Sequence, residues 1–151
     1  MTKKLESVCL SFDARSKSRL LLRLDSGDQA ALVVERGRLL RGGDRVLTQD
    51  GREVEIIAAE ESLLEAFSDD SAAIAKAAFH LGNRHVAVQV MVNRLRFLND
   101  HVLGDMVRGL GLKVTAVTAP FEPEGGAYGH HHAYGSQHPL ILPKIHEFSR
   151  R

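Results

Sequence analysis

The sequence predicts an α+β protein in which a small all-β part precedes a part that alternates strands with helices. Three observations support this prediction. Apolar residues alternate with a period of two up to about residue 60, they recur at helical spacing after about residue 70, and a stretch rich in Gly, His and Pro follows. We therefore expect a β-rich domain over residues 1–68, a mixed domain over residues 69–122 and a flexible tail over residues 123–151.

The first part reads as a series of short strands. Its clearest alternation is that of Leu20, Leu22 and Leu24, which share one strand face. The stretches AALVVERG, RLLRGGDRVLTQ and REVEIIAA continue the pattern. The pair Asp50–Gly51 favours a tight hairpin between the last two stretches, because that turn needs residues that tolerate positive φ.

The period becomes helical after the polar stretch 68–71. One apolar face predicts a helix that Asp69, Asp70 or Ser71 caps and that Gly82 ends. The residues of that face are Ile74, Ala77, Ala78 and Leu81.

The rest of the mixed part predicts further strands and one more helix. VAVQVMV reads as a strand with its valines on one face, and KVTAVTAPF reads as another. Between them, NDHVLGDMVRGLG predicts a helix that Asn99 or Asp100 caps and Gly111 ends. With an extra strand near residues 93–98, the order is compatible with a ferredoxin-like βαββαβ domain.

Composition excludes several classes of protein. The 20 basic residues nearly balance the 19 acidic ones, which argues against a nucleic-acid partner. No apolar run is long enough to span a membrane, and the first residues lack the apolar core of a signal peptide. Cys9 is the only cysteine, which fits a reducing cytoplasm, and we expect it to be a small core residue on a strand.

Catalytic motifs are absent from the sequence. It contains no H-E-x-x-H, no Walker A loop, no G-x-S-x-G and no G-x-G-x-x-G, so we expect no enzymatic activity. One alternative is a metal-dependent hydrolase that uses His85 and His101 with a carboxylate. Another is a regulator whose shape responds to metal.

His85 is the first candidate metal ligand. It follows the end of the first predicted helix and opens a predicted strand, with its side chain on the face of Gln89 and Met91. A two-fold axis nearby would supply a second copy of the same imidazole. The alternative is a surface histidine at a strand end.

His101 is the second candidate, in the first turn of the second predicted helix. Its neighbour Asp100 could cap the helix, orient the imidazole or act as a weak ligand. The alternative is a solvated first-turn residue. His80 and His146 show no ligand spacing, so we expect an ordinary, partly exposed residue at position 80 and no metal role at either.

Four of the eight histidines lie in the glycine-rich tail. A short repeat carries them, because Ala127–His132 reads AYGHHH and Ala133–His138 reads AYGSQH. Imidazole suits Ni²⁺, Zn²⁺ and Cu²⁺, and the glycines leave the chain free to fold around an ion. The candidate tail ligands are His130, His131, His132 and His138. A random polar tail is the alternative.

Four blocks of residues together resemble the urease accessory nickel metallochaperones, the UreE family. They are Leu81–His85 (LGNRH) with Gln89, Asp100–Leu103 (DHVL) with Met106, Pro120–Gly129 (PFEPEGGAYG), and the histidine-bearing tail. The resemblance covers most of residues 70–138 and depends on the order and spacing of these blocks.

The resemblance implies a fold, a cargo and partners. It implies a peptide-binding-like β domain, a ferredoxin-like metal-binding domain and a homodimer formed through the latter. The family's principal metal histidine falls on His85 of both subunits, and a ligand found in some members falls on His101. Some members have a further histidine where this chain has Asn99. The implied function is cytoplasmic delivery of Ni²⁺ to urease through the urease GTPase, while Zn²⁺ or Cu²⁺ could occupy the same ligands.

Overall fold

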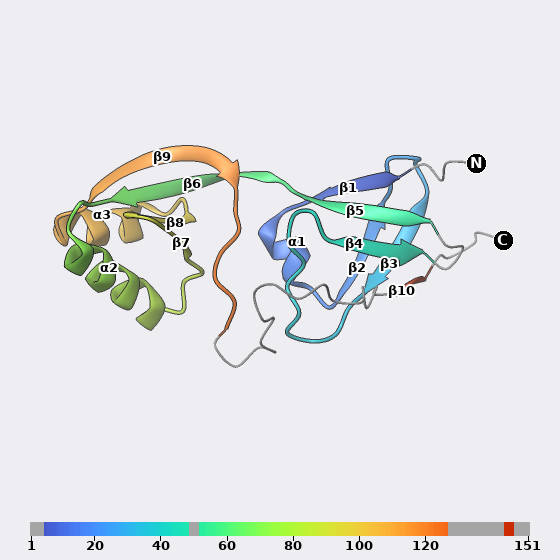
Figure 1. Cartoon of the computed structure of the whole chain (residues 1–151), viewed down its shortest axis with the longest axis horizontal. Helices are drawn as coiled ribbons and strands as arrows, with labels where there is room; N and C mark the ends of the chain where they lie inside the picture. Colours follow the sequence, from blue (N-terminus) through green and yellow to red (C-terminus); the bar gives the residue numbers. More distant parts are fainter. Residues whose placement is uncertain (1–4, 49–51, 127–143, 147–151) are drawn as a thin grey trace. The chain divides into compact units, whose positions relative to one another are not determined.

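The computed structural model describes residues 5–48, 52–126 and 144–146 (Figure 1). Those residues form two compact units, one of them running to Ala58 and resuming at Gly125, the other spanning Ala59–Glu124. The elements are β1 (Glu6–Leu10), α1 (Phe12–Ser16), β2 (Arg19–Arg23), β3 (Gln29–Val33), β4 (Arg45–Thr48), β5 (Glu53–Ala58), β6 (Glu60–Phe67), α2 (Ser71–Asn83), β7 (Gln89–Met91), β8 (Arg94–Leu98), α3 (His101–Gly109), β9 (Lys113–Pro120) and β10 (Lys144–His146).

The first unit is built on a six-stranded sheet with the order β1-β5-β4-β10-β3-β2. The predicted alternation is confirmed, since Leu22 and Leu24 are buried and Leu20 packs against the same core. The antiparallel pairing of β4 with β5 is that of the predicted hairpin, although its turn residues Asp50–Gly51 lie outside the described residues.

Two details of the first unit differ from expectation. The sheet is accompanied by a short helix, α1, whose fully buried Arg15 donates hydrogen bonds to the carbonyls of Leu10 and Leu40 at 3.2 and 3.1 Å. The prediction that Cys9 is a core residue is wrong. Cys9 is exposed because the inward face of β1 carries Val8 and Leu10 instead.

Part of the expected tail forms a strand. β10 lies between β3 and β4 in the first sheet, with Ile145 opposite Leu32 of β3 and Lys144 opposite Leu47 of β4. The expectation of one flexible tail over residues 123–151 therefore does not hold for residues 144–146. Residues 127–143 and 147–151 lie outside the described residues.

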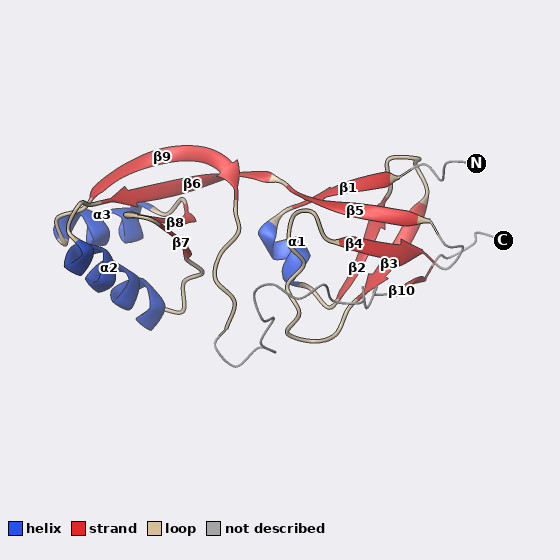
Figure 2. Ribbon diagram, in the orientation of Figure 1, coloured by secondary structure: helices blue, strands red, loops and turns tan. Residues whose placement is uncertain are grey.

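The second unit has the ferredoxin-like topology that the sequence predicts. Its four-stranded sheet has the order β7-β8-β6-β9, and every neighbouring pair is antiparallel. Each helix therefore connects two strands with a third strand between them, and the ribbon diagram shows both helices on one face of the sheet (Figure 2). No helix in the described part of the chain is long and apolar enough to cross a membrane.

The division between the units lies earlier than the expected boundary after residue 68. β6 belongs to the second sheet because it is a central strand there, paired with β8 on one side and with β9 on the other. Its inward residues Leu64 and Ala66 are part of the core under the helices. The helix α3 approaches this strand closely, since a Cβ added at Gly104 would lie 2.9 Å from Leu64.

Candidate metal site

The topology of the second unit brings both candidate histidines to the same end of its sheet. β8 is antiparallel to β6, so its last residue, Leu98, lies opposite Leu63 near the start of β6. α3 begins three residues later with His101. α2 leaves the opposite end of β6 and returns before β7 begins, so His85 lies at the end where α3 starts.

His85 occupies the left-handed position of the turn that ends α2. The cap residue is Arg84, and the His85 N–H donates to the Gly82 carbonyl at 3.0 Å. The Val86 N–H reaches back to the Leu81 carbonyl at 3.2 Å. These two bonds define a Schellman motif, and the contact between Val86 and the core that contains Leu81 completes it.

The backbone at His85 is uncommon for a residue that carries a Cβ. Its φ is +57°, and among the described residues positive φ otherwise occurs only at glycines and at Asn93. Glycine is the usual residue in this position because a Cβ disfavours it by about 1–2 kcal/mol. The histidine held there has an exposed side chain.

Two expectations around His85 are wrong. Gly82 does not end α2, because the helix continues to Asn83 and Gly82 supplies one of the carbonyls of the turn. His85 does not open a strand, because β7 begins only at Gln89 and includes just part of the predicted VAVQVMV strand. The helix-ending turn, rather than a strand face, therefore sets the direction of the His85 side chain.

A segment after β9 is fastened beside this turn. The Glu124 N–H donates to the Val88 carbonyl at 2.8 Å, and the Glu122 N–H donates to the side-chain oxygen of Gln89 at 3.1 Å. Phe121 is fully buried and Pro123 is buried as well. The chain that leads into the histidine-bearing tail is thus tied to residues only three and four positions after His85. Sequence patterns gave no signal for this pairing, because it joins backbone groups far apart in the chain.

His101 is exposed at the first position of α3. Of the roles considered for Asp100, the cap is confirmed, since its carboxylate accepts from the N–H groups of Val102 and Leu103 at 2.8 and 3.1 Å. Asn99 extends the link between β8 and β6, because its side chain donates to the Ser62 hydroxyl at 3.1 Å.

The remaining histidines divide into three cases. His80 is exposed on α2 and lies edge-on to Phe79, with ring centroids 5.4 Å apart. His146 lies on β10 in the first unit. His130, His131, His132 and His138 lie outside the described residues. Within the described ranges, no three His, Cys, Asp or Glu side chains come together as a metal site.

Family models account for both units of the chain. A model of the UreE urease accessory protein, N-terminal domain, matches residues 2–59, and a model of the C-terminal domain of the same protein matches residues 61–147.

Curated relatives match over nearly the whole chain. A urease accessory protein UreE of Dechloromonas aromatica (strain RCB) is 48% identical over 97% of this chain and 93% of its own length. Proteins of the same name are 52% identical in Pseudomonas putida (strain GB-1), over 81% of this chain and 74% of that protein, and 49% identical in Citrobacter koseri, over 85% and 88%.

Proposed function

This chain belongs to the UreE urease accessory protein family, and from that premise we propose that it is a cytoplasmic carrier of Ni²⁺ for urease assembly, without catalytic turnover. The observation that carries the proposal is the left-handed backbone of His85, an exposed imidazole on a position where a glycine would be more stable.

The turn around His85 suits a metal ligand because its backbone is held on both sides. Two hydrogen bonds to the end of α2 fix its main chain, and the core fixes Val86 behind it. The imidazole therefore projects from a rigid element, as a well-defined first ligand requires. Imidazole nitrogen is a favourable ligand for Ni²⁺, while Zn²⁺ and Cu²⁺ share the preference.

One imidazole does not hold a metal tightly, so the proposal includes a second copy of the chain. A two-fold axis beside this turn would place His85 of each subunit against the same ion, because an isologous contact pairs a residue with itself. His101 lies at the same end of the sheet and could serve as a further ligand there. The homodimer is part of this proposal.

The tail histidines would complete or shield the coordination. His130 is six residues after Glu124, so the chain from that anchor spans at most about 20 Å to His130. Two hydrogen bonds hold Glu124 and Glu122 to Val88 and Gln89, which are three and four residues after His85. Such a tail can deliver the ion to the urease GTPase and the urease apoprotein, the partners proposed here.

The test compares two exposed histidines of the same region. We expect His85→Ala to lose the site that binds one Ni²⁺ per dimer, whereas His80→Ala removes an imidazole from α2 and should leave that site intact. Native mass spectrometry with Ni²⁺, Zn²⁺ and Cu²⁺ reports dimer mass and metal count together, and calorimetry reports affinity. A His85→Ala protein that still binds one tight Ni²⁺ per dimer would contradict the proposal.

A further inference from the structure

The first unit has an open sheet edge along β2. The strand order ends at β2, so no described strand pairs with its outer side. Two hydrogen bonds to the residues that flank β3 fix the direction of the peptide groups of β2. The Ser18 carbonyl accepts from Val34 N–H at 2.9 Å, and the Leu24 N–H donates to the Asp28 carbonyl at 2.8 Å. Because peptide direction alternates along a strand, residues 19, 21 and 23 turn their peptide groups to the open side.

The side chains of those three residues form a basic and apolar row. Arg19, Leu21 and Arg23 are exposed, whereas Leu22 and Leu24 on the other face are buried. Leu21 is 63% exposed, and this exposure is unfavourable because its side chain is apolar. Arg19 and Arg23 have no ion-pair partner in the part of the chain that the structure describes.

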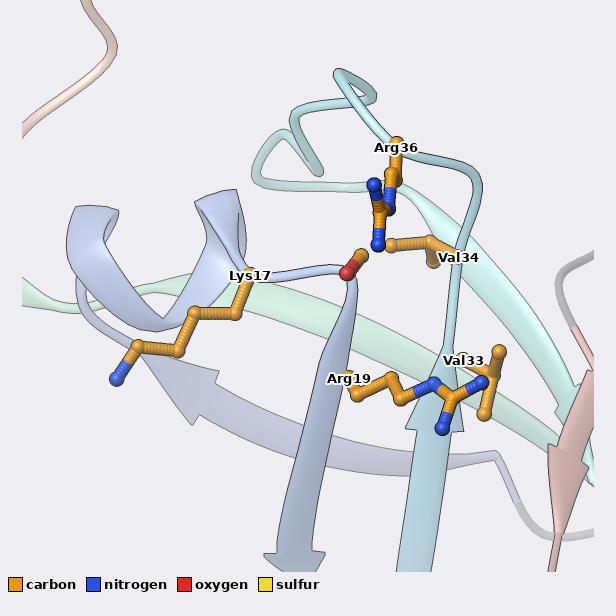
Figure 3. A pocket seen from close by; sticks show the side chains of 6 residues that line it. Lys17, Arg19, Val33, Val34 and Arg36 are labelled. Carbon is orange, nitrogen blue, oxygen red and sulfur yellow. The ribbon is translucent and has the colours of Figure 1, made fainter.

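A basic notch of about 700 Å³, open to solvent, lies where this edge begins. Figure 3 shows Arg19 extending over Val33 of β3, and Arg36 pointing its guanidinium toward the start of β2. Lys17 is already paired with Asp13 at 3.1 Å, but Arg36, like Arg19, has no ion pair among the described residues. The notch therefore adds uncompensated positive charge to one end of the open edge.

We propose that this edge binds an extended acidic segment of a partner protein, which adds to the sheet as an antiparallel strand beside β2. The open peptide groups of residues 19, 21 and 23 would pair with its backbone, as in other cases of strand addition. The register then places an acidic residue opposite Arg19, an apolar residue opposite Leu21 and an acidic residue opposite Arg23. This inference concerns the first unit and does not rest on metal binding.

The charges on the edge also select against other occupants. Edge strands of soluble proteins carry charged residues that prevent pairing with a second copy, and two such basic edges would repel each other. An acidic strand meets the opposite condition. A nucleic acid would use the positive charge but not the peptide groups, and the chain as a whole carries a net charge of only +1.

The probe is a fluorescein-labelled peptide in which threonines alternate with three other residues, in the order glutamate, valine, glutamate. Its binding to the full-length protein is measured by fluorescence anisotropy. We expect saturable binding that weakens as salt rises, and at least about tenfold weaker binding when lysines replace the glutamates, because cross-strand charge pairs then become repulsive.

N-methylation of the peptide distinguishes strand addition from simple charge attraction. In the proposed register, the peptide groups of the glutamates and valine face β2, whereas those of the threonines face away. N-methyl groups on the first set should abolish binding, and N-methyl groups on the second set should leave it largely unchanged. Equal binding by both methylated peptides would overturn the proposed strand.

Two variants locate the site on the protein. The double variant Arg19→Glu with Arg23→Glu should bind the acidic peptide at least about tenfold more weakly. The control, Lys76→Glu with Lys113→Glu, changes the net charge by the same amount in the second unit, where both lysines are exposed, and should bind normally. Equal loss in both double variants would show binding to net charge alone and overturn the proposal. If an oligonucleotide of equal charge competes with the acidic peptide at the same concentration, the proposal is overturned as well.

Leu21→Pro gives a further check if the charge variants fold poorly. The Leu21 N–H faces the open side, so proline there removes a donor without breaking a bond to β3. We expect Leu21→Pro to fold but to lose the peptide, whereas Leu21→Thr, which keeps the N–H, should retain it. Binding by a folded Leu21→Pro protein that matches the wild type would contradict the proposed pairing.

Discussion

α2 and α3 end in the same kind of turn but place different residues in its left-handed position. At the end of α2, His85 N–H donates to the Gly82 carbonyl at 3.0 Å and has a φ of +57°. At the end of α3, Gly111 N–H donates to the Arg108 carbonyl at 2.9 Å and has a φ of +95°. Glycine is the expected residue for this position, and α3 follows the rule.

The two positions differ in why each holds its residue. Gly111 is explained by the backbone alone, since a helix-ending turn needs positive φ. His85 is not explained in that way, because its Cβ opposes the conformation that the turn imposes. The exposed imidazole is therefore the feature to explain, and the metal site proposed above is one explanation. Exchanging the residues at the two positions tests both explanations.

The largest expected change in stability comes from placing histidine at the end of α3. Nothing lies within 4 Å of a Cβ added at Gly111, so Gly111→His should carry only the conformational penalty, about 1–2 kcal/mol of lost unfolding free energy. Chemical denaturation measures it. The control is Gly109→Ala, in the last turn of α3 and equally open, which should be neutral or stabilising by up to about 1 kcal/mol. A Gly111→His protein as stable as the wild type would remove the argument from strain.

A smaller change of opposite sign is expected at the end of α2. His85→Gly removes the unfavourable Cβ and should raise the unfolding free energy by about 0.5–1 kcal/mol, less than the full penalty because glycine also gains freedom in the unfolded chain. The same variant should lose the proposed Ni²⁺ site. His85→Ala keeps the Cβ and should lose the metal without the gain in stability. Loss of stability in metal-free His85→Gly would show that the imidazole supports the fold instead.

Much of this second unit could be predicted from local sequence pattern. Asp70 and Asp100 cap α2 and α3 as expected, since each follows a polar stretch and precedes an apolar stripe. The sequence pattern does not predict that the turn residue is His85. Gly82 is the stronger helix-stop signal, and nothing in LGNRH shows that the turn uses the fourth residue after Leu81.

β6 lies in the second unit although the expected boundary follows residue 68, and the physical reason is different. Leu63, Leu64, Glu65 and Ala66 are all buried, so the period of two that reveals a half-exposed strand is lost. Glu65 adds to the difficulty because it reads as a surface residue. Glu65 is only 8% exposed, and its carboxylate is paired with Arg94 at 2.9 Å and Arg96 at 2.8 Å on the neighbouring strand. The buried charge of Glu65 is compensated because the pairing of β6 with β8 brings these two arginines to it.

The smallest expected effect tests whether the neighbourhood of His85, and not the imidazole alone, distinguishes the end of α2. Gln89→Ala removes the acceptor for the Glu122 N–H and leaves the bond from Glu124 to Val88 in place. The tail should then spend less time near His85, and Ni²⁺ affinity should fall by about two- to threefold, which corresponds to about 0.5 kcal/mol. Stoichiometry should not change. Calorimetry of Gln89→Ala checks this, with Gln89→Glu, which keeps an acceptor oxygen, as the control. The counter-test uses protein truncated after Gly129, with and without Gln89→Ala. If Gln89→Ala lowers the Ni²⁺ affinity of the truncated protein by the same factor, Gln89 acts on His85 rather than through the tail.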